Sequence, residues 1–350
     1  MDKSLDIQLT ETLRAYLASG VEEQVDYQKF YLYSIVTHST AIEGSTVTEI
    51  ENQLLFDEGI AAKGRSLTEQ MMNVDLKDAY LHGFQLAKQE IVYTPTLLRE
   101  LAAKVMRRTG GQYSTMVGEF DSSKGDFRLC NVSAGIGGRS YLAYNKVKPA
   151  VENFCNWLNA EIAAIDRKDV AACYRLSFEA HFRLVTIHPW VDGNGRTTRL
   201  VMNIIQRQLG LVPSIVTKDD KGEYIQSLVD SRKDEDSTIA QDMMLRHHIG
   251  NLKKRTLQYQ QDETQNDTVK RDTDTVNDTV KSVALEGNVA RVLAAVQATP
   301  DFTYDQYAAS LSLGRATVAR AIKLLQTEGY ITRSGSDKKG SWVINSSKIN

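Results

Sequence analysis

Apolar residues return at intervals of three and four positions through most of residues 5–260. This spacing is that of amphipathic helices, so this part of the chain is predicted to be all-α. Two glycine-rich stretches, 109–112 and 121–142, interrupt the pattern and predict a loop or short hairpin. The helix expected over 170–185 should stop at Pro189, because proline disfavours helix at the residue before it.

Composition changes after residue 260. Residues 261–283 contain no aromatic side chain, and they repeat Asn-Asp-Thr-Val-Lys at 266–270 and 277–281. We interpret 261–284 as a linker. A strand or helix that pairs with a second copy of the protein is the alternative, so a homodimer remains open.

The last 66 residues, 285–350, predict a separate small domain. Helices are expected near 288–296 and 304–311, then a turn at 312–314 and a third helix over 315–327. Two short strands around a polar, basic tip should follow. This order has helix-turn-helix spacing and resembles a winged helix.

The charge of this C-terminal segment suits DNA only weakly. Eight Lys and Arg residues face five acidic ones, a surplus of three, and Arg315, Arg320 and Lys323 lie on the predicted recognition helix. Winged helices also dock proteins, so both partners stay open.

The bulk composition is that of a globular protein with two or three domains. The chain has 350 residues, 42% of them hydrophobic, and a formal net charge of −2, which excludes a general basic field for nucleic acid. It lacks an apolar leader and any run of about 18 apolar residues. Its three cysteines show no Cys-x-x-Cys spacing. We therefore expect a cytoplasmic protein that makes no membrane contact.

The chemistry is concentrated between His188 and Asn203. Gly193 and Gly195 allow a sharp turn directly before a helix, and the exposed amides and dipole of a helix start favour an anion. Arg196 and Arg199 follow on one helical face with Asn203, at i, i+3 and i+7. This arrangement predicts a phosphate site.

Two further side chains indicate what happens at that site. A carboxylate at Asp192, beside bound phosphate, implies a hard cation such as Mg²⁺. His188 can accept a proton near neutral pH. Together they suggest attack by a hydroxyl on a phosphorus atom. A plain surface turn with a core-facing histidine is the alternative; a calcium loop lacks the required acids.

The stretch resembles the signature of the Fic family, His-x-Phe-x-(Asp/Glu)-Gly-Asn-Gly-Arg-x-x-Arg. All of its positions match except that Trp190 replaces phenylalanine. The family has a helical fold with a β-hairpin flap, and its members transfer AMP from ATP to a protein hydroxyl. The resemblance covers roughly residues 25–260.

The resemblance implies a role for each matching residue. His188 would deprotonate the hydroxyl that attacks the α-phosphate, and Asp192 would hold Mg²⁺. The nucleotide would be bound by the loop amides and by the side chains that follow, which are Gly193, Asn194, Gly195, Arg196, Arg199 and Asn203. The flap should lie within 128–142, with Val132, Gly135 and Ile136, although the double proline that often follows it is missing.

A second motif resembles the family's inhibitory pattern, (Ser/Thr)-x-x-x-Glu-(Gly/Asn). It is found at Ser39–Gly44, at the end of a predicted helix, and implies an ion pair between Glu43 and Arg199 that obstructs the γ-phosphate. The same pattern recurs at 282–287, with Glu286. The first copy is preferred because it closes a helix in the all-α part.

These features divide the chain into four parts. They are an N-terminal helical region with the inhibitory helix (1–95), a Fic catalytic core (96–260), the linker (261–284) and a winged helix (285–350). The predicted function is AMP transfer to a Ser, Thr or Tyr hydroxyl of a protein, with the chain itself a candidate target. Removal of AMP through Glu43, or DNA-binding regulation with a nucleotide-sensing Fic half, are the alternatives.

Overall fold

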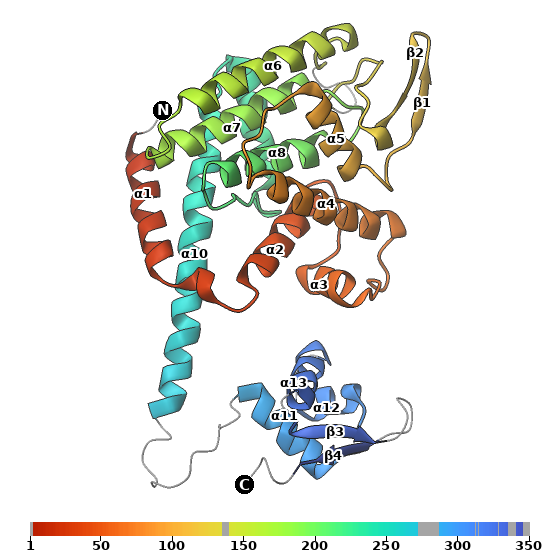
Figure 1. Ribbon diagram of the computed structural model, residues 1–350, viewed down its shortest axis with the longest axis vertical. Coiled ribbons are helices and arrows are strands. Elements are labelled where there is room, and N and C mark those ends of the chain that lie inside the picture. Colours follow the sequence, from red (N-terminus) through yellow and green to blue (C-terminus); the bar gives the residue numbers. More distant parts are fainter. Residues whose placement is uncertain are drawn as a thin grey trace. The chain divides into compact units, whose positions relative to one another are not determined.

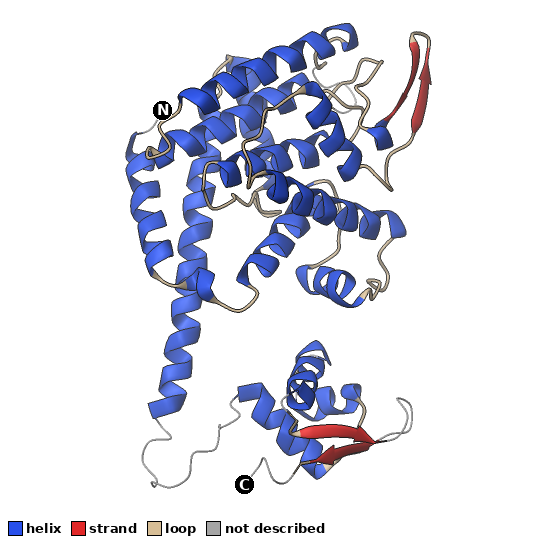
Figure 2. Ribbon diagram, in the orientation of Figure 1, coloured by secondary structure: helices blue, strands red, loops and turns tan. Residues whose placement is uncertain are grey.

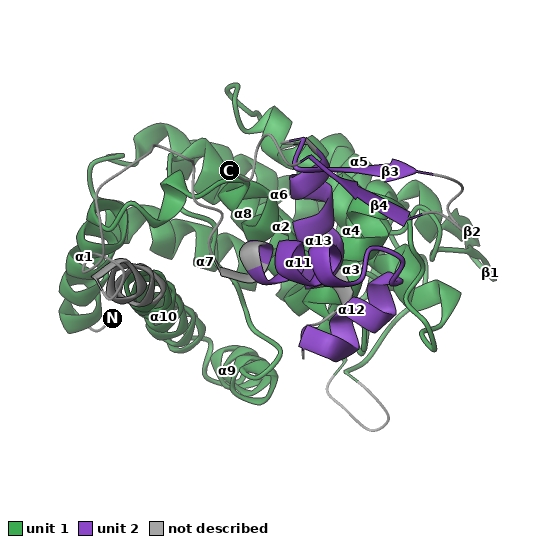
Figure 3. Ribbon diagram, turned by 90° about the horizontal axis from the view of Figure 1, so that it is seen from below, with its two compact units in different colours: residues 1–267 green, residues 268–350 purple. Residues whose placement is uncertain are grey.

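The computed structural model describes residues 3–134, 140–271, 287–311, 313, 315–327, 329–334 and 341–345. The chain divides into two compact units, Met1–Asp267 and Thr268–Asn350 (Figure 3). Helices dominate both units, and the strands are few and short, as Figure 2 shows. The prediction of a mainly α fold is confirmed.

Unit 1 contains ten helices, two 3₁₀ turns and one hairpin among its described residues (Figure 1). The helices are α1 (Lys3–Ala18), α2 (Tyr27–Ile42), α3 (Glu49–Glu58), α4 (Leu67–Leu86), α5 (Pro95–Val105), α6 (Tyr144–Ala164), α7 (Val170–Ile187), α8 (Asn194–Gln208), α9 (Lys221–Asp234) and α10 (Thr238–Arg271). The 3₁₀ turns are Val21–Glu23 and Ser122–Lys124, and the antiparallel strands are β1 (Gln112–Thr115) and β2 (Gly118–Asp121).

Helix α8 is the central element of this unit. It packs against α2, α4, α5 and α7, and every residue from Arg196 to Gln206 is buried. Leu200, Ile204 and Ile205 fill the core, as their spacing predicts. The helix stops before Gly210, whose φ of 76° is a left-handed value that favours glycine.

Helix α7 ends where the sequence predicts. Asp169 caps its start by accepting a hydrogen bond from the Ala172 amide at 2.9 Å. The last helical residue is Ile187, and His188 takes the left-handed conformation directly before Pro189. The loop that carries the chemistry therefore begins at the C-terminus of one buried helix and ends at the N-terminus of another.

The helix α2 also ends at a left-handed glycine. Gly44 has a φ of 103°, and Glu43 is the last residue before it. Tyr31 and Ile35, part of the predicted apolar stripe of this helix, are buried in the core of unit 1. The predicted helix ending at Ser39–Gly44 is thus present, and it packs against α4 and α8.

Two details differ from the sequence-based prediction. The hairpin of β1 and β2 lies between the two glycine-rich breaks, and the described ends of segment 128–142 are joined by a single antiparallel bridge between Ser133 and Ser140. Helix α10 continues through Arg271, so the linker does not start at residue 261. Residues 261–271 contain no glycine or proline, the two residues that most strongly interrupt a helix.

Unit 2 has the element order that was predicted for 285–350. Its elements are α11 (Gly287–Ala298), α12 (Tyr304–Leu311), α13 (Arg315–Thr327), β3 (Ile331–Ser334) and β4 (Ser341–Ile344). The two strands pair antiparallel, with Ile331 opposite Ile344. Val292, Ile322 and Trp342 contribute to a separate apolar core. Three helices and a hairpin are compatible with a winged helix, which stays a prediction.

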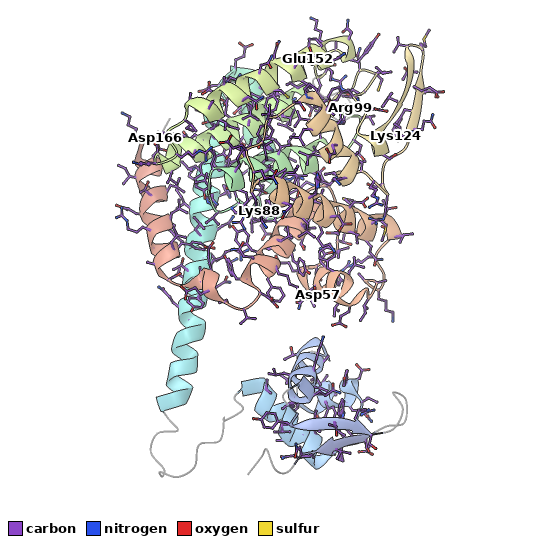
Figure 4. All side chains as sticks on the ribbon, in the orientation of Figure 1. Asp57, Lys88, Arg99, Lys124, Glu152 and Asp166 are labelled. Atoms are coloured by element: carbon purple, nitrogen blue, oxygen red, sulfur yellow. The ribbon has the colours of Figure 1, made fainter. Side chains whose placement is uncertain are left out.

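The surface of unit 1 is charged, whereas the residues of the predicted site are mostly internal. Lys88, Lys124 and Glu152, which are labelled in Figure 4, are exposed. In the described part of the chain, none of the helices combines the length and the apolar character needed to cross a membrane.

Candidate active site

The loop between α7 and α8 is closed by hydrogen bonds within itself. The side chain of Asn194 accepts from the amide of Trp190 at 3.1 Å and donates to its carbonyl at 2.8 Å. Trp190 is buried, and its indole donates to the carbonyl of Gly125 at 3.1 Å. It therefore serves as the apolar anchor of the loop. Gly193, at the start of α8, has a φ of 77° that a side chain would strain.

His188 is held at the edge of this loop, next to an aromatic ring. Its imidazole stacks on Tyr141, with ring centroids 3.8 Å apart and planes inclined by 17°. Its Nδ1 lies 3.4 Å from the carbonyl oxygen of Val185, and a proton on Nδ1 leaves Nε2 as the basic atom. Burial, aided by the nearby charges of Arg128 and Arg232, lowers the pKa of His188 to about 4. The imidazole is thus neutral at pH 7 and able to accept a proton.

Arg196 is a buried cation with unused donors. Only 4% of its side chain is exposed, and its Nη2 lies 3.4 Å from Asp192 Oδ1. Within the described part of the chain, its Nε and Nη1 atoms have no hydrogen-bond partner. Burial lowers its pKa, but a guanidinium remains charged at neutral pH. Buried donors of this kind require an acceptor, and Arg196 belongs to the first turn of α8, whose amides are also donors.

Arg199, one turn further along α8, is fully engaged with the end of α2. Its Nε donates to Ser39 Oγ at 2.9 Å and its Nη2 to the Ser39 carbonyl at 2.9 Å. The same Nη2 lies 2.6 Å from Glu43 Oε1. Tyr224 of α9 accepts from Nη1 at 3.4 Å. The predicted contact between Glu43 and Arg199 is therefore present.

The carboxylate of Glu43 also lies against the first turn of α8. A Cβ atom on Gly195 would be 2.2 Å from Glu43 Oε1 and 2.9 Å from Arg199 Nη1. Burial raises the pKa of Glu43, but the charge and hydrogen bond of Arg199 outweigh it and hold the pKa below 4.5. A charged carboxylate thus occupies the space in front of the helix start, where an anion would bind.

Asp192 could serve as a single protein ligand for a cation. Its side chain is 60% exposed, and among the described residues only Oδ1 has partners, the amide of Gly193 and Arg196. No group of three His, Cys, Asp or Glu side chains that could hold a metal occurs among the residues that the structure describes. Mg²⁺ is usually bound by one or two carboxylates together with substrate phosphates. One free carboxylate oxygen beside an anion site fits that mode.

A cavity of about 240 Å³ is shared by His188, Glu43 and Arg199. Gly195 of the first turn of α8 also lines it, together with apolar side chains of α9. Its lining residues are Ile42, Glu43, Ala134, Tyr141, Val185, His188, Gly195, Arg199, Tyr224, Ile225, Leu228, Val229 and Arg232. A flat apolar group could lie against α9 while an attached anion faced α8.

Asn203 is used differently from what its place on the helix face predicts. Its side chain accepts a hydrogen bond from the Tyr80 hydroxyl at 2.8 Å and donates to Gln206 and to the Ser214 carbonyl, both at 2.9 Å. The oxygen and the nitrogen of its side-chain amide are thus both hydrogen-bonded within the core. It holds α8 to α4 and to residue 214, and it offers no free donor to a nucleotide.

The predicted flap is described only at its two ends. The carbonyl of Val132 accepts a hydrogen bond from the Tyr141 amide at 3.0 Å, next to the bridge between Ser133 and Ser140. Gly135 and Ile136 lie outside the described residues, as does Glu286 of the second inhibitory pattern. The roles predicted for them therefore stay predictions.

Tyr141, Tyr224 and Arg232 were missed by the sequence analysis, whereas Arg128 begins the predicted flap segment but its contact with the loop was not predicted. Tyr224 and Arg232 come from α9, where the sequence has no motif, and the Arg232 guanidinium lies 4.7 Å from the Tyr141 ring. Arg128 donates to the carbonyl of His188 at 2.8 Å. Only the position of Tyr141 at the end of a glycine-rich segment hinted at a role.

Comparison with known proteins identifies the domain that carries this site. Residues 92–206 match the sequence model described as the Fic/DOC family. The chain is 30% identical over 192 residues to "Protein adenylyltransferase Fic" of Drosophila erecta, covering 54% of this chain and 35% of that protein. The protein of the same name from Drosophila sechellia is 27% identical over 225 residues. The chain thus spans 35% to 41% of the length of these relatives.

Solved structures share the fold. A Fic domain containing signaling protein of Bacteroides thetaiotaomicron superposes with a TM-score of 0.60 at 18% identity, covering 72% of this chain and 97% of that one. Fic-1 of C. elegans, residues 134–508, has a TM-score of 0.59 at 21% identity and covers 74% of each chain. A Fic family protein of Desulfovibrio desulfuricans covers 98% of this chain and 95% of its own, with a TM-score of 0.57 at 17% identity.

Proposed function

Since residues 92–206 match the Fic/DOC family model, we propose that this chain is a nucleotidyltransferase that moves AMP from ATP to a hydroxyl group of a protein. The observation that carries the proposal is the buried Arg196 beside the start of α8, two of whose guanidinium nitrogens have no partner among the described residues. A phosphate group supplies the oxygen acceptors that these nitrogens lack.

The groups around the cavity suit each part of the reaction. The acceptor hydroxyl gives its proton to Nε2 of the neutral His188, and its oxygen forms a bond to the α-phosphorus of ATP. The bond from that phosphorus to the bridging oxygen of the β-phosphate breaks, and pyrophosphate leaves. In this proposal, the amides of Gly193, Asn194 and Gly195 and the side chain of Arg196 would stabilise the charge that develops on the phosphate oxygens.

Asp192 is the residue that would hold Mg²⁺, through the carboxylate oxygen that has no hydrogen bond to the described residues. A bound Mg²⁺ would neutralise part of the charge of the phosphates. The adenine ring would lie against Ile225, Leu228 and Val229 of α9, which form the apolar wall of the cavity.

We propose in addition that Ser39 and Glu43 restrain the transfer. Arg199 is held by both residues and is not free to bind the outer phosphates of ATP. The carboxylate of Glu43 lies against Gly195, and its negative charge repels the incoming triphosphate. Removing Glu43 should free Arg199 and the space in front of α8 at the same time.

The test uses the full chain carrying Glu43→Gly, incubated with Mg²⁺ and ATP that is radioactive at the α-phosphorus, alone and with host lysate. We expect at least tenfold more protein-bound label than with the wild type, and an intact mass increased by one AMP where the chain modifies itself. His188→Ala in the same background should abolish the label. ATP labelled at the γ-phosphorus should transfer nothing.

The matched control is Glu286→Gly, which removes the glutamate of the second pattern. Its labelling should equal that of the wild type. Activation by Glu286→Gly and not by Glu43→Gly would move the restraint to the second pattern. Absence of label from every variant, with all candidate targets of the lysate present, would count against AMP transfer.

The reverse reaction is a second candidate, favoured by the common cavity of Glu43 and His188. In this role Glu43 would orient a water molecule to remove AMP from a modified protein. Protein labelled by the Glu43→Gly variant, freed of ATP and then mixed with wild type, decides the matter. Loss of label with the wild type but not with Glu43→Gln supports removal.

Unit 2 is proposed to bind DNA, because its three helices and hairpin have the order expected of a winged helix. Retention on duplex DNA should fall with salt and survive His188→Ala. It should be lost in Arg315→Ala with Arg320→Ala if α13 is the recognition helix. If the double variant were retained on DNA as well as the wild type, a protein partner for unit 2 would be favoured.

A further inference from the structure

Arg128 is a buried cation bonded to the backbone of three separate segments. Its side chain is 1% exposed. Nε donates to the carbonyl of His188 at 2.8 Å, Nη1 donates to that of Cys130 at 2.7 Å, and Nη2 donates to that of Leu142. The amide of Arg128 also donates to the Pro189 carbonyl at 3.0 Å. One residue thus joins both ends of the flap segment to the loop of the site.

No carboxylate lies within ion-pair distance of this guanidinium among the described residues. A buried cation without a counter-ion is unfavourable unless its donors are satisfied. Here carbonyl oxygens alone satisfy them, which requires the planar fork of an arginine; a lysine could reach only part of the set. An apolar side chain would avoid the buried charge but would leave the carbonyls of His188, Cys130 and Leu142 without this donor, so Arg128 is the group that holds the three carbonyls together.

The backbone that Arg128 holds is in an unfavourable conformation. His188 has φ 54° and ψ 62°, left-handed values that residues with a side chain rarely adopt. The proline that follows it favours extended backbone instead. The amide of His188 is tied to the Leu184 carbonyl, and its own carbonyl is tied to Arg128. Such a conformation persists only where its surroundings impose it.

Arg128 also fixes the ring that covers the imidazole. It bonds to the carbonyl of Leu142, the residue directly after Tyr141, and Tyr141 stacks on His188. The orientation of the imidazole therefore depends on Arg128 through two routes, the backbone of His188 and the stacked ring.

We propose that Arg128 is a positioning residue that sets the orientation of the His188 imidazole relative to the bound nucleotide. The expected effect on kinetics rests on the proposed function. None of the contacts of Arg128 involves Gly193, Gly195 or Arg196, the groups assigned to the phosphates. Loss of Arg128 should therefore reduce kcat and leave the KM for ATP nearly unchanged.

The first experiment measures AMP transfer in full-length Glu43→Gly protein carrying Arg128→Gln or Arg128→Lys. We expect kcat to fall at least tenfold with Gln, with Lys between Gln and Arg, and the KM for ATP to stay within about twofold. The matched control is Arg175→Gln. Arg175 is 7% exposed, lies on α7 and pairs with Asp6 and Asp242, away from the loop. The Arg175→Gln change should lower the Tm with little change in kcat.

The second experiment needs no activity. A proton NMR spectrum follows the imidazole resonances of His188, assigned by comparison with His188→Gln. Stacking on Tyr141 shifts these resonances upfield, so Arg128→Gln and Arg128→Lys should move them downfield, toward their positions in Tyr141→Leu. Arg175→Gln should leave them in place.

The outcomes separate the two proposals. If Glu43→Gly transfers no AMP but the imidazole resonances move as expected, the proposed function fails and the positioning role stands. The positioning role of Arg128 would be overturned if the imidazole resonances did not move in either Arg128 variant. It would also be overturned by an unchanged kcat, or by changes of kcat and KM together, as in a destabilised protein. Should Arg128→Gln not fold, Arg128→Lys decides by the same criteria.

Discussion

Glu43 Oε1 lies 2.6 Å from Nη2 of Arg199, at the point where the end of α2 meets the first turns of α8. Arg199 is 3% exposed, and the carboxylate of Glu43 is 33% exposed. The pair therefore joins a buried cation to a carboxylate that water can still reach. Its strength should depend on pH in a way that can be measured.

Glu43→Gln should destabilise the protein at pH 7 but not in acid. The change removes the charge and keeps the shape, and the loss should be about 1.5 kcal/mol, the lower end for a hydrogen bond between charged groups because Glu43 is partly exposed. The pKa of Glu43 is lowered in the folded state, so its contribution is present above its ordinary value of 4.5. It is lost as the pH falls through the folded-state pKa.

Chemical unfolding of both proteins from pH 7 to pH 3.5 checks this. The difference in the free energy of unfolding should shrink steadily below pH 4.5. Glu11→Gln, at an exposed position of α1, is the control and should show no difference at any pH. A difference that is constant with pH would contradict an ionised Glu43.

His188 should remain a neutral base well below the usual pKa of histidine. Burial lowers its pKa from 6.5 to about 4, so the fraction able to accept a proton should stay near its maximum down to about pH 5.5. The single-turnover rate of Glu43→Gly protein should thus show no acid limb near pH 6.5. An NMR titration of the His188 imidazole gives the midpoint directly, and a midpoint near 6.5 would contradict the buried, stacked environment.

His248 should make the protein sensitive to mild acid. Its side chain is buried against Tyr174, and neither ring nitrogen has a partner in the described part of the chain. Burial lowers its pKa to about 3. Because the unfolded chain binds the proton near pH 6.5 and the folded chain does not, stability falls as the pH drops from 6.5 towards 3.

His248→Leu should remove this dependence of stability on pH. Relative to the wild type, the variant should gain about 2 kcal/mol between pH 6.5 and pH 5, from about 1.4 kcal/mol per pH unit. His248→Gln is the control, since it keeps a buried polar group that does not titrate. It should flatten the pH dependence without the gain in stability at pH 7.5 that the apolar side chain brings. Equal pH dependence in all three proteins would show that His248 is exposed to water.

Removal of Mg²⁺ should stop AMP transfer in the Glu43→Gly protein, and Asp192→Asn should raise the Mg²⁺ concentration for half-maximal rate at least tenfold. The reason is that Asp192 is the one carboxylate of the signature loop and has one oxygen unused within the described chain. Transfer is measured with EDTA, then with Mg²⁺ restored in excess. Glu58→Gln, at the exposed end of α3, is the control. Full activity in EDTA would rule out this role.

Local sequence was sufficient for the main elements of the site. Gly193 and Gly210 mark the two limits of α8, because their left-handed conformations do not continue a helix. Pro189 stops α7 for an equally local reason. The spacing of Leu200, Ile204 and Ile205 predicts the buried face of α8, and the signature places His188 and Asp192 in one loop and Arg196 in the first turn of the helix that follows. Helix-turn-helix order in unit 2 was predicted in the same way.

Contacts between distant segments required the folded chain. Asn203 lies on the predicted face of α8, but Tyr80 and the carbonyl of Ser214 take up its side chain. Tyr224 and Arg232 belong to a helix without a motif, and they reach the site only because α9 packs beside it. Helix α10 runs to Arg271, past the predicted start of the linker at residue 261, because a polar composition does not show where a helix ends.

The sequence by itself determined which residues could bind phosphate, accept a proton and end each helix, since turn chemistry and helical period act over a few neighbours. Only the tertiary structure decided that Glu43 lies against Gly195 and that Arg128 bonds to the carbonyl of His188. These contacts join residues far apart in the chain. They depend on how the helices pack, which no local pattern encodes.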